Sequence, residues 1–193
     1  IESIAQKFRA SVLHLNSNLG KAEALRYGFN YLFQESDIKY IGFLDIDGAF
    51  PVSVVHSFIN DSKQKFDTNP QLNAIISSRV KLAGREISRR KMRHYISRVL
   101  ITFLGLKFAK LPYDSQSGLK LFRVNDAFAS AIKEPFRTKW FMDIEFLIRT
   151  GWMESEQVWE IPIDSWSEVS GSHISLRNLI AVLRELISLL RLT

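Results

Sequence analysis

Strand-like and helix-like patterns alternate through the first two thirds of this chain, and that order constrains its fold more than any other feature. The strand candidates are short apolar runs at residues 11–15, 38–44, 73–78, 119–124 and 158–163. The helix candidates carry apolar residues at helical spacing and lie at residues 20–34, 51–66, 88–108, 126–133, 142–149 and 176–192. This alternation predicts a layered α/β fold with a mainly parallel sheet.

The composition is that of a globular protein. The chain has 193 residues, enough to bury the core of one domain, and 46% of them are hydrophobic. Because there is no cysteine, disulfides, zinc–thiolate sites and cysteine nucleophiles are excluded. No window of about 18 residues is continuously apolar, so no membrane-spanning helix is predicted. The absence of cysteine fits a reducing compartment.

Basic charge is concentrated in one segment, residues 79–98. It holds eight Lys or Arg and one acid, Glu86, a local balance of +7. The whole chain carries +6, so the other 173 residues sum to −1. A basic surface spread over the whole fold is therefore excluded. Within the segment we expect Arg89, Arg90 and Lys91 to be solvated or to face lipid headgroups.

The clearest chemical signal is the carboxylate pair Asp45 and Asp47, directly after the apolar run 38–44. In open α/β sheets, ligands collect at the carboxyl ends of the strands. Two carboxylates at that edge suit a hard cation such as Mg²⁺ or Mn²⁺, which would neutralise a departing diphosphate. The alternative is a solvated turn, because Asp and Gly are common turn residues.

Two other segments combine glycine, lysine and polar residues. Lys21, in Asn-Leu-Gly-Lys-Ala, can meet an anion near the positive end of a helix, or can simply be an exposed lysine at a helix start. Residues 114–122 have the composition of a ligand-binding loop before a strand. The polar side chains of that loop include Asp114, Gln116, Ser117 and Lys120.

Asp143 and Glu145 place two carboxylates at the start of a predicted helix. Either is a candidate base if an acceptor hydroxyl must lose its proton. Alternatively, both simply provide favourable charge in the first helical turn.

Taken in order and at these spacings, the segments resemble the inverting glycosyltransferases of family 2, which have the GT-A fold. The resemblance is strongest to the dolichyl- or polyprenyl-phosphate glucosyl- and mannosyltransferases. It covers residues 11–175 and rests on N-x-G-K-A, the D-x-D strand end, S-R before a basic helix, D-x-Q-x-G-x-K-x-F, F-x-D-x-E, and E-x-P-I followed by W-x-E-x-x-G-S. The last motif is more similar to that of the glucosyl members. We expect a GT-A-like domain over 1–175 and an amphipathic helix over 176–193.

The resemblance implies roles for named residues. The expected catalytic residues are Asp45, Asp47, Asp114, Gln116, Asp143 and Glu145. The nucleotide sugar would be bound by Lys21, Asp45 and Asp47, and the metal by Asp47 and Asp45. The acceptor phosphate would be bound by Arg79, Arg93, Ser97 and Lys120.

Two positions depart from the family pattern. Ala49 stands where some members carry a glutamine as a further metal contact. His173 stands where a lysine or arginine is usual, so the charge there would depend on pH near the reference pKa of about 6.5.

The implied reaction is transfer of a hexose, glucose favoured over mannose, from UDP-glucose or GDP-mannose to a polyprenyl phosphate, with inversion and Mg²⁺ or Mn²⁺. A phosphomonoester is already anionic near neutral pH. The protein must then mainly position it and stabilise the leaving diphosphate. The basic helix 88–108, with Val99 and Phe103 on its apolar stripe, would rest on the core or on lipid at the cytoplasmic face of a membrane. The terminal helix would be a second interfacial element, or would pack on the sheet or in a homo-oligomer.

Two other functions remain open at this point. One keeps the fold and transfers sugar to a saccharide acceptor in cell-surface glycan synthesis. The other is a non-catalytic module that binds membranes or nucleic acid through the basic helix. The carboxylate motifs at strand ends make this module the least favoured, and we expect no nucleic-acid partner.

The family begins with an apolar strand that ends in a V-P-x-Y-N-E type motif and helps to bind the nucleotide base. No such motif precedes Asp45. We therefore expect the domain to be incomplete at its N-terminal side, or complemented by another segment.

Overall fold

The computed structural model describes residues 2–34, 37–89, 91–108, 110–169 and 176–191, with the backbone alone for 91–97, 100 and 176–180. A four-stranded sheet forms its centre. The strands are β1 (Tyr40–Leu44), β2 (Ala74–Ser78), β4 (Leu119–Arg123) and β5 (Val158–Pro162), in the order β1-β4-β2-β5. β1, β2 and β5 run in one direction, as predicted for most of the sheet, but β4 runs antiparallel between β1 and β2. Among the three pairings of this sheet, β2–β5 is therefore the parallel one.

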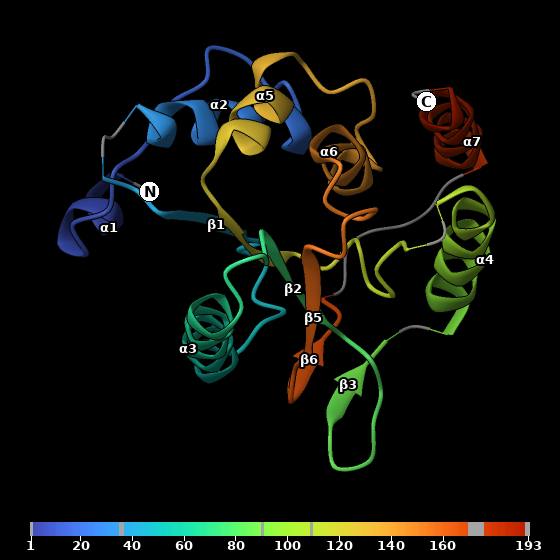
Figure 1. The fold of residues 1–193 in the computed structure, drawn as a ribbon, viewed down its shortest axis with the longest axis horizontal. Helices are drawn as coiled ribbons and strands as arrows, with labels where there is room; N and C mark the ends of the chain where they lie inside the picture. Colours follow the sequence, from blue (N-terminus) through green and yellow to red (C-terminus); the bar gives the residue numbers. More distant parts are fainter. Residues whose placement is uncertain (1, 35–36, 90, 109, 170–175, 192–193) are drawn as a thin grey trace.

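Helices cover both faces of this sheet. α2 (Lys21–Phe33), α5 (Asp126–Lys133) and α6 (Met142–Thr150) lie on one face, and α3 (Val52–Thr68) lies on the other (Figure 1). Alternate residues of a strand point to opposite faces. Ile76 thus packs in the core under α2, α5 and α6, whereas its neighbour Ile75 packs in the core under α3.

A second, two-stranded sheet was not predicted. β3 (Glu86–Ser88) pairs in parallel with β6 (Ser165–Ser167), with Ile87 opposite Trp166. Each strand has three residues and a single buried side chain, so neither produces the alternation by which a strand is recognised. This small sheet joins two segments that are almost eighty residues apart in the chain.

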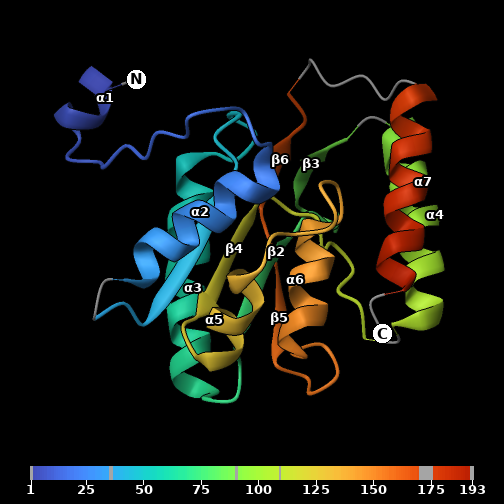
Figure 2. The same cartoon turned by 90° about the horizontal axis from the view of Figure 1, so that it is seen from above.

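Two long helices lie side by side at one end of the molecule, α4 (Lys91–Lys107) and α7 (Leu176–Leu190) (Figures 1 and 2). Leu104, Val182 and Leu189 are buried in the same core as the sheet residues Ile41 and Phe122. Of the predicted apolar stripe of α4, Val99 and Phe103 are exposed. No helix in the described residues has the length and apolar character needed to cross a membrane.

The N-terminal region departs from prediction. Besides α1 (Glu2–Lys7), it has no regular element before α2, and the strand predicted at 11–15 is wrong. A strand needs a hydrogen-bonded neighbour. In the described part of the chain β1 pairs with β4 alone, and nothing pairs with 11–15. The same edge position explains why β1 is not buried on both faces as expected: Ile41 is its one buried residue.

Candidate active site

The predicted site residues come from three segments that meet at one edge of the sheet. Asp45 directly follows β1, and Arg79 directly follows β2. Because β4 is antiparallel, its first residue, Leu119, lies opposite Leu44 at the end of β1. The loop that begins at Asp114 therefore reaches this edge as well, and the Asp45 N–H donates to the Gly118 carbonyl at 2.7 Å.

Asp45 is held by a lysine and by close approach of the backbone. Lys21, the first residue of α2, places its Nζ 2.7 Å from Asp45 Oδ1 and 2.8 Å from Oδ2. On the other side, a Cβ added at Gly118 would lie 2.3 Å from Asp45 Oδ2. Residue 118 must therefore be glycine if the Asp45 carboxylate is to keep this position. Lys21 and Asp45 were predicted together as nucleotide-sugar contacts, and the fold brings them into direct contact.

Asp47 lies in an exposed turn after β1. Its Oδ1 accepts the Ala49 N–H at 3.0 Å, and Gly48 between them has a left-handed φ of 83°. Such an aspartate turn leaves Oδ2 available to a ligand. No group of three or more acidic, histidine or cysteine side chains in the described residues makes a closed metal site. The carboxylate pair fits a Mg²⁺ or Mn²⁺ that is also bound by substrate phosphates, the usual arrangement for Mg²⁺.

Asp114 is the centre of a buried ion cluster. Arg79 donates its Nε to Asp114 Oδ2 and its Nη2 to Oδ1, both at 2.7 Å, and Arg89 Nη2 donates to Oδ2 at 2.7 Å. Burial alone would raise the pKa of Asp114, but these hydrogen bonds and charges outweigh it and hold that pKa well below its usual range. Asp114 is therefore a carboxylate near neutral pH. Its backbone N–H is fixed by Glu160 Oε1 at 2.8 Å.

Lys120 and Asp143 form a second buried pair. Lys120 Nζ donates to Asp143 Oδ1 at 2.5 Å and to the Ser117 carbonyl. Burial lowers the pKa of Lys120, and the charge of Asp143 offsets part of this effect. The charges of Asp45 and Asp143 both act on the pKa of Arg79, so the three ion pairs are close enough to form one electrostatic cluster.

The sequence matches no protein-family model and no curated protein. The structure is similar to crystal structures of glucosyl-3-phosphoglycerate synthase from Mycobacterium tuberculosis. With the complex containing Mn²⁺, UDP-glucose and phosphoglyceric acid, the TM-score is 0.64 at 17% identity, over 98% of this chain and 62% of that one. With the complex of Mn²⁺ and UDP-glucose the TM-score is 0.65, again at 17% identity and the same coverage.

The chain has the GT-A fold. It spans 62% of the length of the structures that it matches. The fold class inferred from the motifs is thereby confirmed.

The side chains of two predicted residues, Glu145 and Gln116, bond to groups outside the ion cluster. Glu145 is fully buried, and its hydrogen bonds within the described residues go to Arg137, Thr138 and Arg149. Its carboxylate accepts the N–H groups of Arg137 and Thr138 and the guanidinium of Arg149, so it fixes the loop before α6. Gln116 donates its Nε2 to the Trp140 carbonyl at 3.0 Å and ties its own loop to the same region. Both contacts are positioning contacts.

Arg89 is a site residue that the sequence reasoning missed. The prediction that it is solvated or faces lipid headgroups is wrong, because its side chain is only 16% exposed and bonds the buried carboxylate of Asp114. The only sequence signal for it was its place in the basic segment 79–98. The side chains of Arg93 and Ser97, predicted to bind the acceptor phosphate, lie outside the described residues, as does His173.

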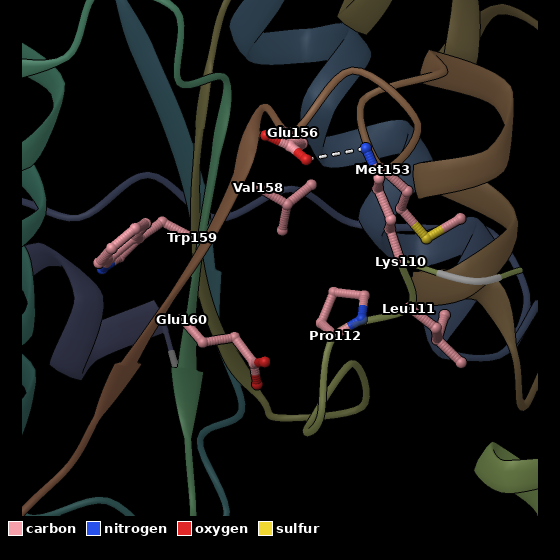
Figure 3. A pocket seen from close by; sticks show the side chains of 8 residues that line it. All are labelled: Lys110, Leu111, Pro112, Met153, Glu156, Val158, Trp159 and Glu160. Carbon is pink, nitrogen blue, oxygen red and sulfur yellow. Dashed lines mark hydrogen bonds and ion pairs between the residues drawn. The ribbon is translucent and has the colours of Figure 1, made fainter. Parts of the chain in front are cut away.

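The structure also has a pocket of about 430 Å³ beside the cluster (Figure 3). It lies between β5 and the segments 110–112 and 153–156, and Val158 points into it from the strand. None of the predicted site residues whose side chains the structure describes lines it. It shares one residue with the supports of the cluster, Glu160, whose carboxylate binds the backbone N–H groups of Tyr113 and Asp114.

Proposed function

We propose that this chain is the core of a metal-assisted inverting glucosyltransferase that uses a nucleotide sugar. The observation that carries the proposal is the meeting of Asp45, Asp114 and Asp143 with their basic partners at one sheet edge of a GT-A fold. The similar synthase structures contain Mn²⁺ and UDP-glucose, which supports glucose over mannose and a divalent metal.

Asp45 and Asp47 would hold the metal together with the phosphates of the nucleotide sugar. Once bound, the metal would supply positive charge to the leaving diphosphate. Lys21 is a second source of such charge, since it contacts Asp45 and sits in the first turn of α2, where the helix dipole also favours anions.

We further propose that the acceptor is a polyprenyl phosphate. A phosphate oxygen would form a bond to the anomeric carbon of glucose while the bond from that carbon to the diphosphate oxygen breaks. A phosphomonoester needs no base for this step, whereas a saccharide hydroxyl does. The best-placed candidate base, Asp143, is engaged by the ammonium group of Lys120, which reduces its use as a proton acceptor. This pairing favours a phosphate acceptor over a saccharide.

Peripheral binding at the cytoplasmic face of a membrane is part of the proposal. On α4, the exposed residues Val99, Phe103 and Leu106 recur at spacings of four and three and so share one helix face. α7 also exposes Leu183 and Ile187. The sequence of α4 contains basic residues and no acid. Exposed apolar residues beside unbalanced basic charge suit an anionic lipid surface.

The test uses the full-length natural protein with radiolabelled UDP-glucose, Mn²⁺ and a polyprenyl phosphate. We expect lipid-extractable label that disappears on chelation of the metal and in the Asp47→Asn variant. A second set of reactions offers phosphoglyceric acid or soluble saccharides in place of the lipid. Transfer to either of these with none to the lipid would overturn the proposed acceptor, and no transfer from any nucleotide sugar would overturn the enzyme activity itself.

A further inference from the structure

We propose that Arg89 and Trp166 complete, with Arg79, a binding site for the phosphate group of the acceptor. The inference rests on the proposed function and adds to it two residues to which the resemblance to family 2 gave no role in phosphate binding. The ligand class is a phosphomonoester dianion, carried either by a polyprenyl lipid or by a small soluble acid.

The first argument is charge. Arg79 alone neutralises Asp114, because it binds both carboxylate oxygens in a two-point contact. Arg89 adds a second guanidinium to the same carboxylate, so the three side chains carry a net positive charge. A phosphate dianion is attracted to a group of side chains with this net charge.

The second argument is the number of N–H donors. A guanidinium group has five, and Arg79 uses two of them on Asp114. No described residue accepts a hydrogen bond from its Nη1. Asp114 thus holds the fork of Arg79 in place and leaves donors for another acceptor, the geometry in which arginine recognises phosphate.

The third argument comes from Trp166, which is 7% exposed. Both guanidinium groups lie against its ring, Arg79 at 4.9 Å and Arg89 at 5.6 Å from the ring centroid. Its indole Nε1 is buried and has no hydrogen-bond partner among the described residues. Buried N–H groups in folded proteins nearly always have a partner, so this donor indicates a missing acceptor. A phosphate oxygen beside the two arginines would provide one.

The small β3–β6 sheet explains how these residues meet. Ile87 on β3 is opposite Trp166 on β6, and Arg89 leaves β3 two residues later. The Glu168 N–H donates to the Ser88 carbonyl at 3.1 Å and fixes the end of the ladder. Without this pairing, Arg89 would not return to the carboxylate that Arg79 binds ten residues earlier.

The experiment measures phosphate binding and transfer in the full-length protein. Inorganic phosphate is titrated calorimetrically, and the KM for farnesyl phosphate and for UDP-glucose is measured separately. The variants are Arg89→Ala, Arg89→Lys, Trp166→Phe and, as a matched control, Arg85→Ala. Arg85 lies in the same segment and carries the same charge, but it pairs with Asp164 at the surface.

We expect Arg89→Ala to weaken phosphate binding and raise the KM for farnesyl phosphate about ten- to a hundredfold, the effect of one lost hydrogen bond to a charged group. Arg89→Lys should recover part of the loss, and Trp166→Phe, which keeps a ring but removes the N–H, should show a smaller loss in the same direction. Arg85→Ala should change either value by no more than about twofold. The KM for UDP-glucose should be unchanged in all four variants.

Equal behaviour of Arg89→Ala and Arg85→Ala would overturn the inference. So would a parallel rise in the KM for UDP-glucose with a lower Tm, because a purely structural role predicts that pattern. If the protein binds phosphate through Arg89 and transfers no glucose to any acceptor, the inference stands and the proposed function fails. If the protein transfers glucose to farnesyl phosphate and Arg89→Ala does not change that transfer, the proposed function stands and the inference about Arg89 fails. Phosphoglyceric acid in place of farnesyl phosphate distinguishes a soluble from a lipid source of the phosphate.

Discussion

The ammonium group of Lys120 donates to the carboxylate of Asp143 at 2.5 Å, and neither side chain is more than 9% exposed. Breaking a buried ion pair on one side leaves an uncompensated charge. We expect Lys120→Met to lower the free energy of unfolding by about 3–5 kcal/mol. Urea denaturation of this variant and of the double variant Lys120→Met, Asp143→Leu tests this. The double variant should recover most of the loss, and an equal loss in both would contradict the prediction.

The ion pairs of Asp114 should make the stability of the folded protein sensitive to acid. Its pKa in the folded protein is held below the ordinary value of 3.8 by Arg79 and Arg89. A depressed carboxyl pKa stabilises the folded state at pH values above 3.8, and this stabilisation is lost as the pH falls further toward the folded pKa. We therefore compare the unfolding free energy of the natural protein with that of Asp114→Asn. The difference between the two should be constant from about pH 5 to 7 and should shrink below about pH 4. A difference independent of pH down to about 2.5 would contradict it.

A side chain at position 118 should disturb the Asp45 carboxylate, which is proposed to bind the nucleotide sugar. In Gly118→Ala the new Cβ would lie 2.3 Å from Asp45 Oδ2, so the carboxylate must leave the position in which it contacts Lys21. We expect a loss of about 1–3 kcal/mol in stability and weaker binding of UDP-glucose with Mn²⁺. Gly28→Ala is the control, because Gly28 lies within α2 with no atom near the added Cβ. It should stabilise the protein by about 0.5–1 kcal/mol and leave binding intact. Thermal unfolding and calorimetric titration measure both effects.

The proposed membrane contact can be tested at Phe103. It is 60% exposed on α4, so Phe103→Ser should leave the Tm unchanged within error. Its removal should weaken binding to vesicles that contain anionic lipid about tenfold, because a phenyl group buried in an interface contributes on the order of 1.5 kcal/mol or more. Tyr31→Ser, at an exposed aromatic residue on α2, should bind vesicles normally. Co-sedimentation with vesicles of neutral and anionic composition gives the readout. Equal binding by all three proteins would rule out a role of α4 in membrane binding.

Most long elements could be predicted because their signals are local. The helical spacing in residues 20–34 and 51–66 and the apolar runs that became β1, β2, β4 and β5 depend on nearby residues alone. The direction of β4 could not be predicted in this way. An apolar strand has the same pattern whether its neighbours are parallel or antiparallel, and only the tertiary arrangement places Leu119 opposite Leu44.

The site shows the same division. Asp45, Asp114, Lys120 and Asp143 could be grouped as candidate site residues because each lies in a motif with polar residues at a strand or helix end. Arg89 was missed because it stands in a run of basic residues that all have the same local context, and only the β3–β6 pairing selects it. Glu145 was grouped with Asp143 on sequence proximity. Two positions along a helix correspond to about 200° of rotation, so the two carboxylates face different surroundings.

If the proposed function holds, the β3–β6 ladder also sets the distance between the two substrate sites. The Ser167 N–H donates to the Ala49 carbonyl at 3.2 Å, and Phe50 packs against the edge of the Trp166 ring. The turn that carries Asp47 and the ladder that carries Arg89 are thus joined at Trp166. We expect insertions or deletions within residues 80–85 to have little effect on the proposed reaction, because the β3–β6 pairing would still fix the position of Arg89. One residue inserted between Ser88 and Arg89 would change the spacing between donor and acceptor, even though it would touch neither.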